Sequence, residues 1–253
     1  MSVRLTAFAC GWLTGPMGGF LRGEEGRLQV PVPAYLIEHP RGTAVFDTGL
    51  HPATQHDPDG WLGGLAKIFE VEFAPGEELA ARLQAVDVDP ARVEWLVNSH
   101  LHFDHVGGNA QLPNSTRVVQ RREWEAGADD DVAAANAFDP KEYRTGQDVL
   151  QVDGEHDLFG DGSVVTVPTH GHTPGHQSLR VKLPSGDVIL AADACYLRRT
   201  LEELHLPGIC ADPETMLDSL RRLRALRDAG ARIFYGHDPE FWATVPQAPA
   251  RVV

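Results

Sequence analysis

Short runs of β-branched, aromatic and aliphatic residues recur along the chain and are bounded by glycine, proline or charged residues. Runs of this length and composition are typical of β-strands. They predict strands at residues 3–9, 30–38, 43–46, 93–98, 117–120, 164–167, 178–183, 188–191 and 232–235. The turn Pro184-Ser185-Gly186-Asp187 predicts a hairpin between two of these strands. The pattern therefore indicates a protein built largely on β-sheet.

Two segments have the apolar spacing of a helix instead. Residues 77–86 repeat leucine and valine at the interval of one helical face. A second helix is expected after Asp212, which is placed to cap it, with Pro213 at its first position and Gly230 just beyond its end. Strands and helices in one chain without an internal repeat predict an α/β protein, and residues 1–253 are expected to form a single domain.

Two stretches fit neither pattern. Residues 51–75 are apolar and glycine-rich without strand alternation, so this excursion either packs on the body, covers a pocket or meets a second subunit. Residues 127–136 are rich in alanine and aspartate, and they are expected to form a mobile surface insertion with little chemical role.

Charge and cysteine content narrow the choice of partners and compartment. With 22 basic and 36 acidic residues the net charge is −14, which would repel nucleic acid and anionic membrane surfaces. The three cysteines form no C-x-x-C pair, so a reducing, cytoplasmic location is expected. The apolar start is interrupted by polar residues and predicts a strand rather than a signal peptide. No apolar run reaches the roughly 20 residues of a membrane span, and a monomer or homodimer is expected.

The segment from His100 to His105 reads His-Leu-His-Phe-Asp-His and follows a predicted strand. It brings three imidazoles and the carboxylate of Asp104 into six residues. Neutral imidazole and carboxylate are the ligands that suit zinc and its divalent neighbours, and catalytic sites leave one position open for water. A solvated histidine-rich turn is the alternative explanation. The cluster is better explained as a metal site.

Three later strand ends supply further candidate ligands. They are the histidine-rich segment 169–176, Asp193 and His237. Strand ends that meet at one edge build a site from residues far apart in sequence. Asp47 ends an earlier strand, and it is either a turn former or an acceptor for the outer N–H of a ligating histidine.

Taken together, these motifs resemble the metallo-β-lactamase superfamily and, within it, the quorum-quenching N-acyl homoserine lactonase family. The resemblance covers nearly the whole chain. It rests on His-Leu-His-Phe-Asp-His-Val-Gly-Gly-Asn at 100–109, His-Thr-Pro-Gly-His-Gln-Ser-Leu at 172–179, Asp-Ala-Cys-Tyr at 193–196 and Phe-Tyr-Gly-His-Asp at 234–238. It implies an αβ/βα sandwich, in which two mixed sheets pack face to face with helices outside.

The resemblance also implies a dinuclear metal centre of two zinc ions, with manganese, cobalt or iron as alternatives. One metal would take His100, His102 and His172, the other Asp104, His105 and His237, and Asp193 would bridge them. His172 is preferred over its neighbour His170, and His176 is expected to be a hydrogen-bonding residue. Dinuclear β-lactamases use a cysteine where this chain has Asp193, so antibiotic hydrolysis is disfavoured.

The implied reaction is the opening of a lactone ring by a hydroxide that bridges the two metals. Tyr196 would donate a hydrogen bond to the oxygen that gains negative charge, and Asp104 or solvent would protonate the leaving alkoxide. The acyl tail of such a substrate needs an apolar groove, for which the candidate residues are Trp12, Leu13, Met17, Phe20, Trp61, Leu65 and Phe69.

Other functions of the same ligand set stay open at this point. A glyoxalase II-like thioesterase, a different lactonase or a phosphodiesterase would use two metals, although thioester and phosphodiester substrates of the anionic kind would favour a basic surface. A persulfide dioxygenase would use one iron and would not need Asp104, His105 and His237 together. A metal-binding module without catalysis leaves Tyr196 unexplained.

Overall fold

Two β-sheets form the centre of the protein, which the computed structural model describes over residues 2–253. Their strands are β1 (Arg4–Pro16), β2 (Arg27–His39), β3 (Gly42–Phe46), β4 (Glu70–Glu72), β5 (Trp95–Val97), β6 (Thr116–Gln120), β7 (Val149–Val152), β8 (Val164–Pro168), β9 (Gln177–Leu183), β10 (Gly186–Leu190) and β11 (Arg232–Phe234). One sheet has the order β4-β1-β2-β3-β5-β6-β7, and the other has the order β11-β10-β9-β8.

Both sheets are mixed. In the larger sheet the pairs β4–β1, β1–β2 and β2–β3 are antiparallel, whereas the pairs β3–β5, β5–β6 and β6–β7 are parallel. In the smaller sheet only the β10–β11 pair is parallel. All nine predicted strands are present, but β1 and β2 are longer than expected. Their antiparallel pairing continues past a bulge between Ala9 and Trp12, and this extension carries the hairpin beyond the rest of the sheet.

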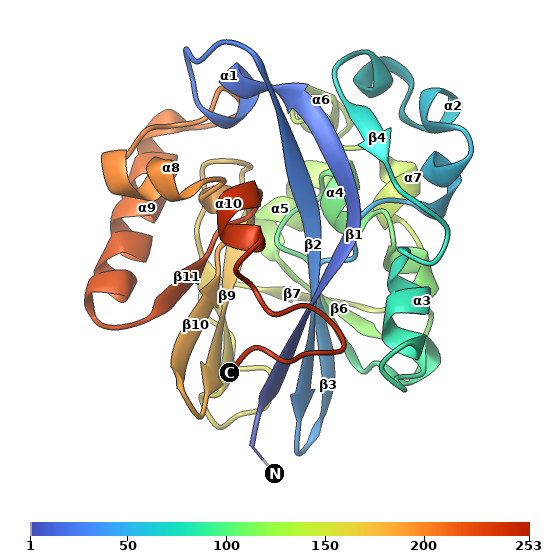
Figure 1. Ribbon diagram of the computed structural model, residues 1–253, viewed down its shortest axis with the longest axis vertical. Helices are drawn as coiled ribbons and strands as arrows, with labels where there is room; N and C mark the ends of the chain where they lie inside the picture. Colours follow the sequence, from blue (N-terminus) through green and yellow to red (C-terminus); the bar gives the residue numbers. More distant parts are fainter. Residues whose placement is uncertain (1) are drawn as a thin grey trace.

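Helices lie outside the two sheets, and the predicted architecture is confirmed (Figure 1). They are α1 (Met17–Phe20), α2 (Pro58–Leu62), α3 (Leu79–Gln84), α4 (Phe103–Val106), α5 (Arg121–Ala128), α6 (Asp130–Ala135), α7 (Pro140–Tyr143), α8 (Arg198–Glu203), α9 (Pro213–Asp228) and α10 (Pro239–Trp242). The side chain of Asp212 accepts from the backbone N–H groups of Glu214 and Thr215, so the predicted cap of α9 is confirmed. No helix within residues 2–253 is long and apolar enough to cross a membrane.

The main hydrophobic core lies between the sheets. Leu5, Ile37 and Phe46 of the larger sheet pack in one cluster with Val181 and Leu190 of the smaller sheet. The outer faces are covered separately. Leu79 and Leu83 of α3 cover the larger sheet, and Leu220 and Leu223 of α9 cover the smaller one. Figure 1 shows these two helices on opposite sides of the molecule, with both chain termini at one end. The loops at the other end are therefore held between two rigid layers.

The prediction of a mobile insertion at residues 127–136 is wrong. This stretch holds the end of α5 and all of α6, and Ala133 packs in a buried cluster with Leu101 and Tyr143. The composition of this stretch suggested a loop, but aspartate and alanine can also form a capped helix. Asp129 accepts hydrogen bonds from the first turn of α6, and alanine has the strongest helix propensity.

The apolar excursion at residues 51–75 forms short helical turns, including α2, and ends in β4 on the edge of the larger sheet. It is anchored to α7 at one point. The indole N–H of Trp61 donates to a carboxylate oxygen of Glu142, and the Lys141 ammonium lies 4.6 Å from the centre of the Trp61 ring. The other carboxylate oxygen of Glu142 has no hydrogen-bond partner within residues 2–253. Burial raises the pKa of Glu142 to about 7.

This buried carboxyl makes a prediction about stability. The pKa of Glu142 is higher in the folded protein than in the unfolded chain, so the folded protein binds this proton more tightly. The unfolding free energy of the wild type, relative to that of Glu142→Gln, is therefore highest at low pH and falls as the pH rises through about 7. Between about pH 5 and pH 8, Glu142→Gln should therefore gain about 1–3 kcal/mol of unfolding free energy relative to the wild type. Thermal unfolding at several pH values measures this difference, with exposed Glu240→Gln as the control. A difference that does not change with pH would contradict the prediction.

Candidate metal centre

The candidate ligands meet at the end of the sandwich opposite the chain termini, and both sheets supply them. His100 and His102 lie on the loop after β5, and the single turn of α4 carries Asp104 and His105. From the smaller sheet come His172 in the loop between β8 and β9, Asp193 after β10 and His237 after β11. The donor atoms form two groups, His100, His102, His172 and Asp193 in one and Asp104, His105 and His237 in the other. Within each group they lie within 4.8 Å of one another.

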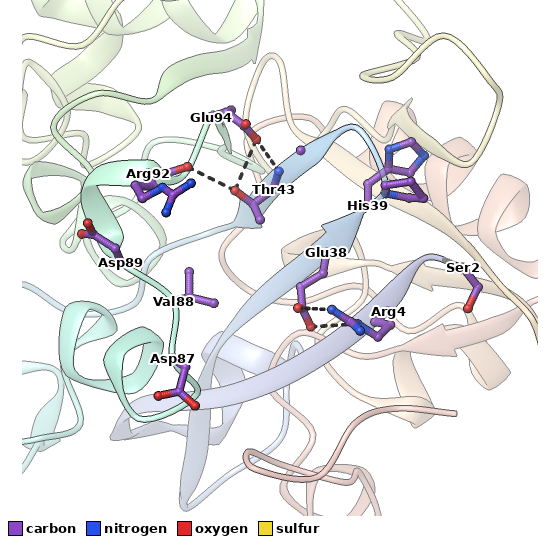
Figure 2. Close-up of a pocket in the computed structure, with 12 residues that line it drawn as sticks. Ser2, Arg4, Glu38, His39, Thr43, Asp87, Val88, Asp89, Arg92 and Glu94 are labelled. Atoms are coloured by element: carbon purple, nitrogen blue, oxygen red, sulfur yellow. Dashed lines mark hydrogen bonds and ion pairs between the residues drawn. The ribbon is translucent and has the colours of Figure 1, made fainter.

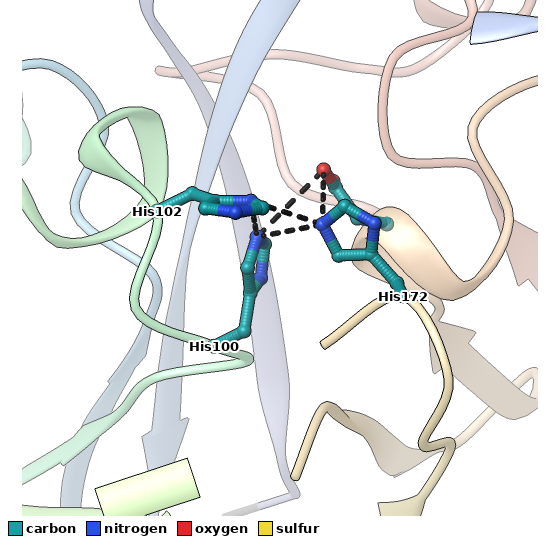
Figure 3. Close-up of side chains that lie close together, drawn as sticks. His100, His102 and His172 are labelled. Atoms are coloured by element: carbon teal, nitrogen blue, oxygen red, sulfur yellow. Dashed lines mark hydrogen bonds and ion pairs between the residues drawn. The ribbon is translucent and has the colours of Figure 1, made fainter. Parts of the chain in front are cut away.

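Three imidazoles point at one another in the first group (Figure 3). His100 Nε2 lies 2.8 Å from His102 Nδ1, and His172 Nε2 lies 3.2 Å from the former and 3.0 Å from the latter. Three nitrogens bound to one zinc ion at about 2.0–2.1 Å would be separated by a similar distance. The spacing fits a shared metal ion.

The hydrogen-bond partner of the outward nitrogen of each ring determines whether the inward nitrogen carries a proton. His102 Nε2 lies 2.8 Å from the carbonyl oxygen of Asn136, and His172 Nδ1 lies 3.1 Å from that of Ile209. A carbonyl only accepts, so both outward nitrogens hold the proton. Ser99 donates its hydroxyl proton to the carboxylate of Asp47, and its oxygen therefore accepts a hydrogen bond from His100 Nδ1 at 2.9 Å. Three bare lone pairs thus face one point, and this arrangement is favourable only around a cation.

The same logic applies to the second group. His105 Nδ1 donates to Asp47 Oδ2 at 2.9 Å, and His237 Nδ1 donates to the carbonyl oxygen of Pro31 at 2.8 Å. The inward Nε2 atoms of these two rings lie 3.1 Å and 3.0 Å from Asp193 Oδ1. They also lie 3.6 Å and 3.5 Å from Asp104 Oδ2. His105 Nε2 and Asp193 Oδ1 are buried without a hydrogen-bond partner among residues 2–253, as expected of groups that bind a metal.

Asp193 joins the two groups. While its Oδ1 atom faces His105 and His237, its Oδ2 atom lies 3.4 Å from His172 Nε2 and 3.8 Å from His100 Nε2. One carboxylate oxygen is thus directed at each cluster. A carboxylate placed in this way can bridge two metal ions.

Asp47 is more than a turn former. Besides His105 Nδ1, its carboxylate accepts from the backbone N–H and the hydroxyl of Ser99, both at 2.7 Å. Because Ser99 in turn accepts from His100, one buried carboxylate orients a histidine of each cluster. Such outer partners fix ring orientation and raise ligand basicity. Of the two explanations left open by the sequence, the structure supports the role as acceptor.

The protonation equilibria differ between the two clusters. Burial lowers the pKa of His172 to about 3 and that of His100 well below its usual range, so both rings are neutral at pH 7. Burial opposes charge on His105 and His237 as well, but the carboxylates of Asp193 and Asp104 outweigh it and raise both pKa values. The second cluster therefore lies in a negative field that attracts a cation.

Tyr196 stands over the centre. Its ring stacks on His237 with centroids 5.4 Å apart, and its hydroxyl lies 3.4 Å from His172 Nδ1. Burial and the carboxylates of Asp193 and Asp104 hold the pKa of this phenol well above its usual value. The hydroxyl is protonated and can donate a hydrogen bond into the pocket.

A pocket opens from the metal clusters. Its polar lining residues are His102, Asp104, Asp193, Tyr196 and His237, and its apolar lining residues are Leu13, Phe20, Val30, Leu65, Phe69, Phe103, Ala137 and Ile209. Four of the seven groove residues expected from the sequence are among them. Trp12 instead packs against the core between the sheets, and Met17 and Trp61 pack behind the pocket. The excursion that carries Leu65 and Phe69 therefore forms part of the pocket wall.

The other histidines of segment 169–176 lie outside both clusters. His170 Nδ1 lies 3.0 Å from the backbone carbonyl of His176, and His176 Nδ1 lies 3.0 Å from the hydroxyl of Thr169. Sequence reasoning missed Asn136 and Ile209, because both act through backbone carbonyls, which carry no side-chain signal.

A larger hollow of about 350 Å³ lies at the other end of the sandwich (Figure 2). Its walls carry opposite charges that pair with one another, such as Arg4 with Glu38, and Glu94 accepts from the hydroxyl and backbone N–H of Thr43. These polar groups are satisfied by each other or by solvent. Among the described residues, the hollow lacks the converging metal-ligand atoms that characterise the candidate metal centre.

Comparison with known proteins gives a consistent result. Residues 27–237 match the family model of the metallo-β-lactamase superfamily. The chain is 37% identical over 235 residues to the N-acyl homoserine lactonase AttM of Azorhizobium caulinodans, which covers 90% of this chain and 89% of that protein. It is 31% identical over 218 residues to the N-acyl homoserine lactonase AiiA of Bacillus thuringiensis subsp. kurstaki, with 84% and 83% covered.

Solved structures agree with the sequence relatives. An N-acyl homoserine lactone hydrolase with the product N-hexanoyl-L-homoserine bound at its catalytic metal centre superposes with a TM-score of 0.89 at 27% identity, covering 100% of both chains. A variant of B. thuringiensis AiiA with N-decanoyl-L-homoserine bound at the active site gives the same TM-score and identity. The chain therefore belongs to the metallo-β-lactamase superfamily and, within it, to the N-acyl homoserine lactonase family.

Proposed function

We propose that this protein opens the lactone ring of N-acyl homoserine lactones at a centre of two divalent metal ions. The observation that carries the proposal is the pair of ligand clusters that share Asp193 at the base of a largely apolar pocket. The names of the relatives and the products bound in the solved structures support the substrate class.

The donor sets suit two zinc ions. Imidazole and carboxylate are ligands that zinc accepts, although manganese, cobalt and iron accept them as well. His100, His102 and His172 would hold one ion, and Asp104, His105 and His237 the other, with Asp193 shared. When bound, the two ions supply a water-derived nucleophile at neutral pH and polarise the ester carbonyl.

The protein's own groups would then bind and orient the substrate. The Tyr196 hydroxyl, which is protonated at neutral pH, is placed to donate to the carbonyl oxygen as negative charge develops on it. Asp104 lines the same pocket, and its carboxylate can accept the proton that the attacking water releases and pass it to the leaving ring oxygen. Apolar side chains such as Phe20, Phe69 and Ile209 exclude water and contact the acyl tail.

The alternatives from the sequence are less well supported. A persulfide dioxygenase with one iron would leave the second cluster without a role, although His105 Nε2 and His237 Nε2 lie 3.1 Å and 3.0 Å from the shared carboxylate of Asp193. A thioesterase that acts on anionic glutathione esters would meet Asp104, Asp193 and an apolar wall in the pocket. No lysine or arginine side chain lines this pocket within the described residues.

A substrate panel tests the proposal. Proton release at constant pH is measured with N-acyl homoserine lactones of different tail lengths, simple γ- and δ-lactones, a glutathione thioester and a phosphodiester. The acyl homoserine lactones should be hydrolysed fastest, with about two zinc-like ions per chain. Removal of metal by a chelator should abolish turnover, and added metal should restore it. Faster hydrolysis of the thioester, or full activity of the metal-free protein, would overturn the proposal.

Tyr196→Phe tests the role of the phenol. Loss of a donor to a developing oxyanion should lower kcat roughly 100-fold, while metal content stays at the wild-type value. Tyr143→Phe is the matched control, because its hydroxyl is also buried but donates to the carbonyl of Gly127, outside the pocket. Unchanged kcat in Tyr196→Phe would show that Tyr196 is only a packing residue.

A further inference from the structure

Glu123 is a fully buried carboxylate that belongs to neither metal cluster. Its exposed fraction is 0%, and it lies in the first turn of α5, outside the pocket. A charged side chain in such a place is costly unless every lone pair that it presents is used. The identity of its hydrogen-bond donors therefore indicates what the carboxylate does.

All three donors to Glu123 come from the loops that carry the first-cluster histidines. The backbone N–H of Leu101, between His100 and His102, donates to Oε1 at 3.1 Å. The Thr173 hydroxyl and the Gly175 backbone N–H donate to Oε2 at 2.9 Å and 2.7 Å. Thr173 directly follows His172 in the sequence. One carboxylate thus joins the loop of the larger sheet to the loop of the smaller one.

The packing around Glu123 requires this close approach. A Cβ atom at position 175 would lie 2.2 Å from the backbone nitrogen of Glu123, so only glycine lets the β8–β9 loop come this near to α5. The three donors also require a group that only accepts. A glutamine would turn an N–H toward at least one of them and leave a buried donor without a partner.

We propose that Glu123 is a positioning residue for the first metal. It fixes the distance between the loop of His100 and His102 and the loop of His172, so that their three nitrogens converge before a metal ion binds. The inference rests on the proposed metal ligands but not on the identity of the substrate. It predicts that Glu123 affects metal affinity without contacting a metal.

The two loops have a second connection, which allows variants of Glu123 to fold. Gln177 donates from its backbone N–H to the carbonyl of Ser99 at 2.9 Å and from its side chain to the carbonyl of Asn98 at 2.8 Å. Ser99 directly precedes His100, so these bonds also connect the loop of the larger sheet to the smaller sheet. They hold the sheets together when the bonds to Glu123 are weakened.

The experiment compares Glu123→Gln with Glu142→Gln. Both wild-type side chains are buried carboxyls, and burial raises the pKa of each to about 7, but the hydrogen bond of Glu142 comes from Trp61 and not from a loop that carries a ligand. Zinc dissociation constants are measured for each protein by competition with a chromophoric chelator. The absorption spectrum of the cobalt-substituted proteins reports the ligand geometry, and thermal unfolding of the metal-free proteins reports stability.

Glu123→Gln should weaken zinc binding roughly 10- to 100-fold and alter the cobalt spectrum, as removal of outer partners of a metal site does. Glu142→Gln should keep the wild-type affinity and spectrum even where its stability changes. If Glu123→Gln loses only stability and binds zinc as the wild type does, the carboxylate is merely structural and the proposal is wrong. A wild type that binds no zinc would instead overturn the proposed centre, and this role with it.

Thr173→Val covers the case in which Glu123→Gln does not fold. It removes one of the three donors and keeps the shape of the side chain. Zinc binding should weaken several-fold in the same direction. Wild-type affinity and an unchanged cobalt spectrum in Thr173→Val would refute the positioning role.

Discussion

Lone pairs that face one another are the constraint on which the rest of this structure depends. The inward nitrogens of His100, His102 and His172 lie about as close to one another as hydrogen-bonded atoms, yet none of them holds a proton to share. Their protons are committed outward, to two backbone carbonyls and a serine oxygen. The arrangement is repulsive by itself, and it persists because the surrounding structure holds it in place. Bound cations would turn this repulsion into ligand bonds.

The sandwich provides the required rigidity. Its two sheets share one core, and each contributes ligands that lie close to the ends of its strands. Asp47 orients a histidine of each cluster, and Glu123 connects the two loops of the first cluster. Both oxygens of Asp47 and of Glu123 accept hydrogen bonds, whereas Asp193 Oδ1 has no hydrogen-bond donor within the described residues. Two buried atoms without a hydrogen-bond partner within the described residues, His105 Nε2 and Asp193 Oδ1, lie at the place where the chemistry is proposed.

The structure brings the predicted ligand side chains together because they lie near strand ends, where the fold joins distant segments. The sequence predicted nine of the eleven strands within residues 2–253 and the capped helix α9 because their signals are local, but it did not predict β4 and β7. The hydrogen-bond partners of the ligand histidines and their loops were harder to predict. Asn136 and Ile209 act through carbonyls, which every residue has, and Asn136 lies in a stretch whose composition suggested a loop. Glu123 was missed because a glutamate in a helix is ordinarily exposed.

The central claim is that two cations lie on either side of Asp193. Anomalous diffraction from crystals of the metal-loaded protein, with data above and below the zinc absorption edge, tests it directly. The account predicts two anomalous peaks, one among His100, His102 and His172 and one among Asp104, His105 and His237, each next to a different oxygen of Asp193. A single peak, or a peak outside these groups, would contradict it.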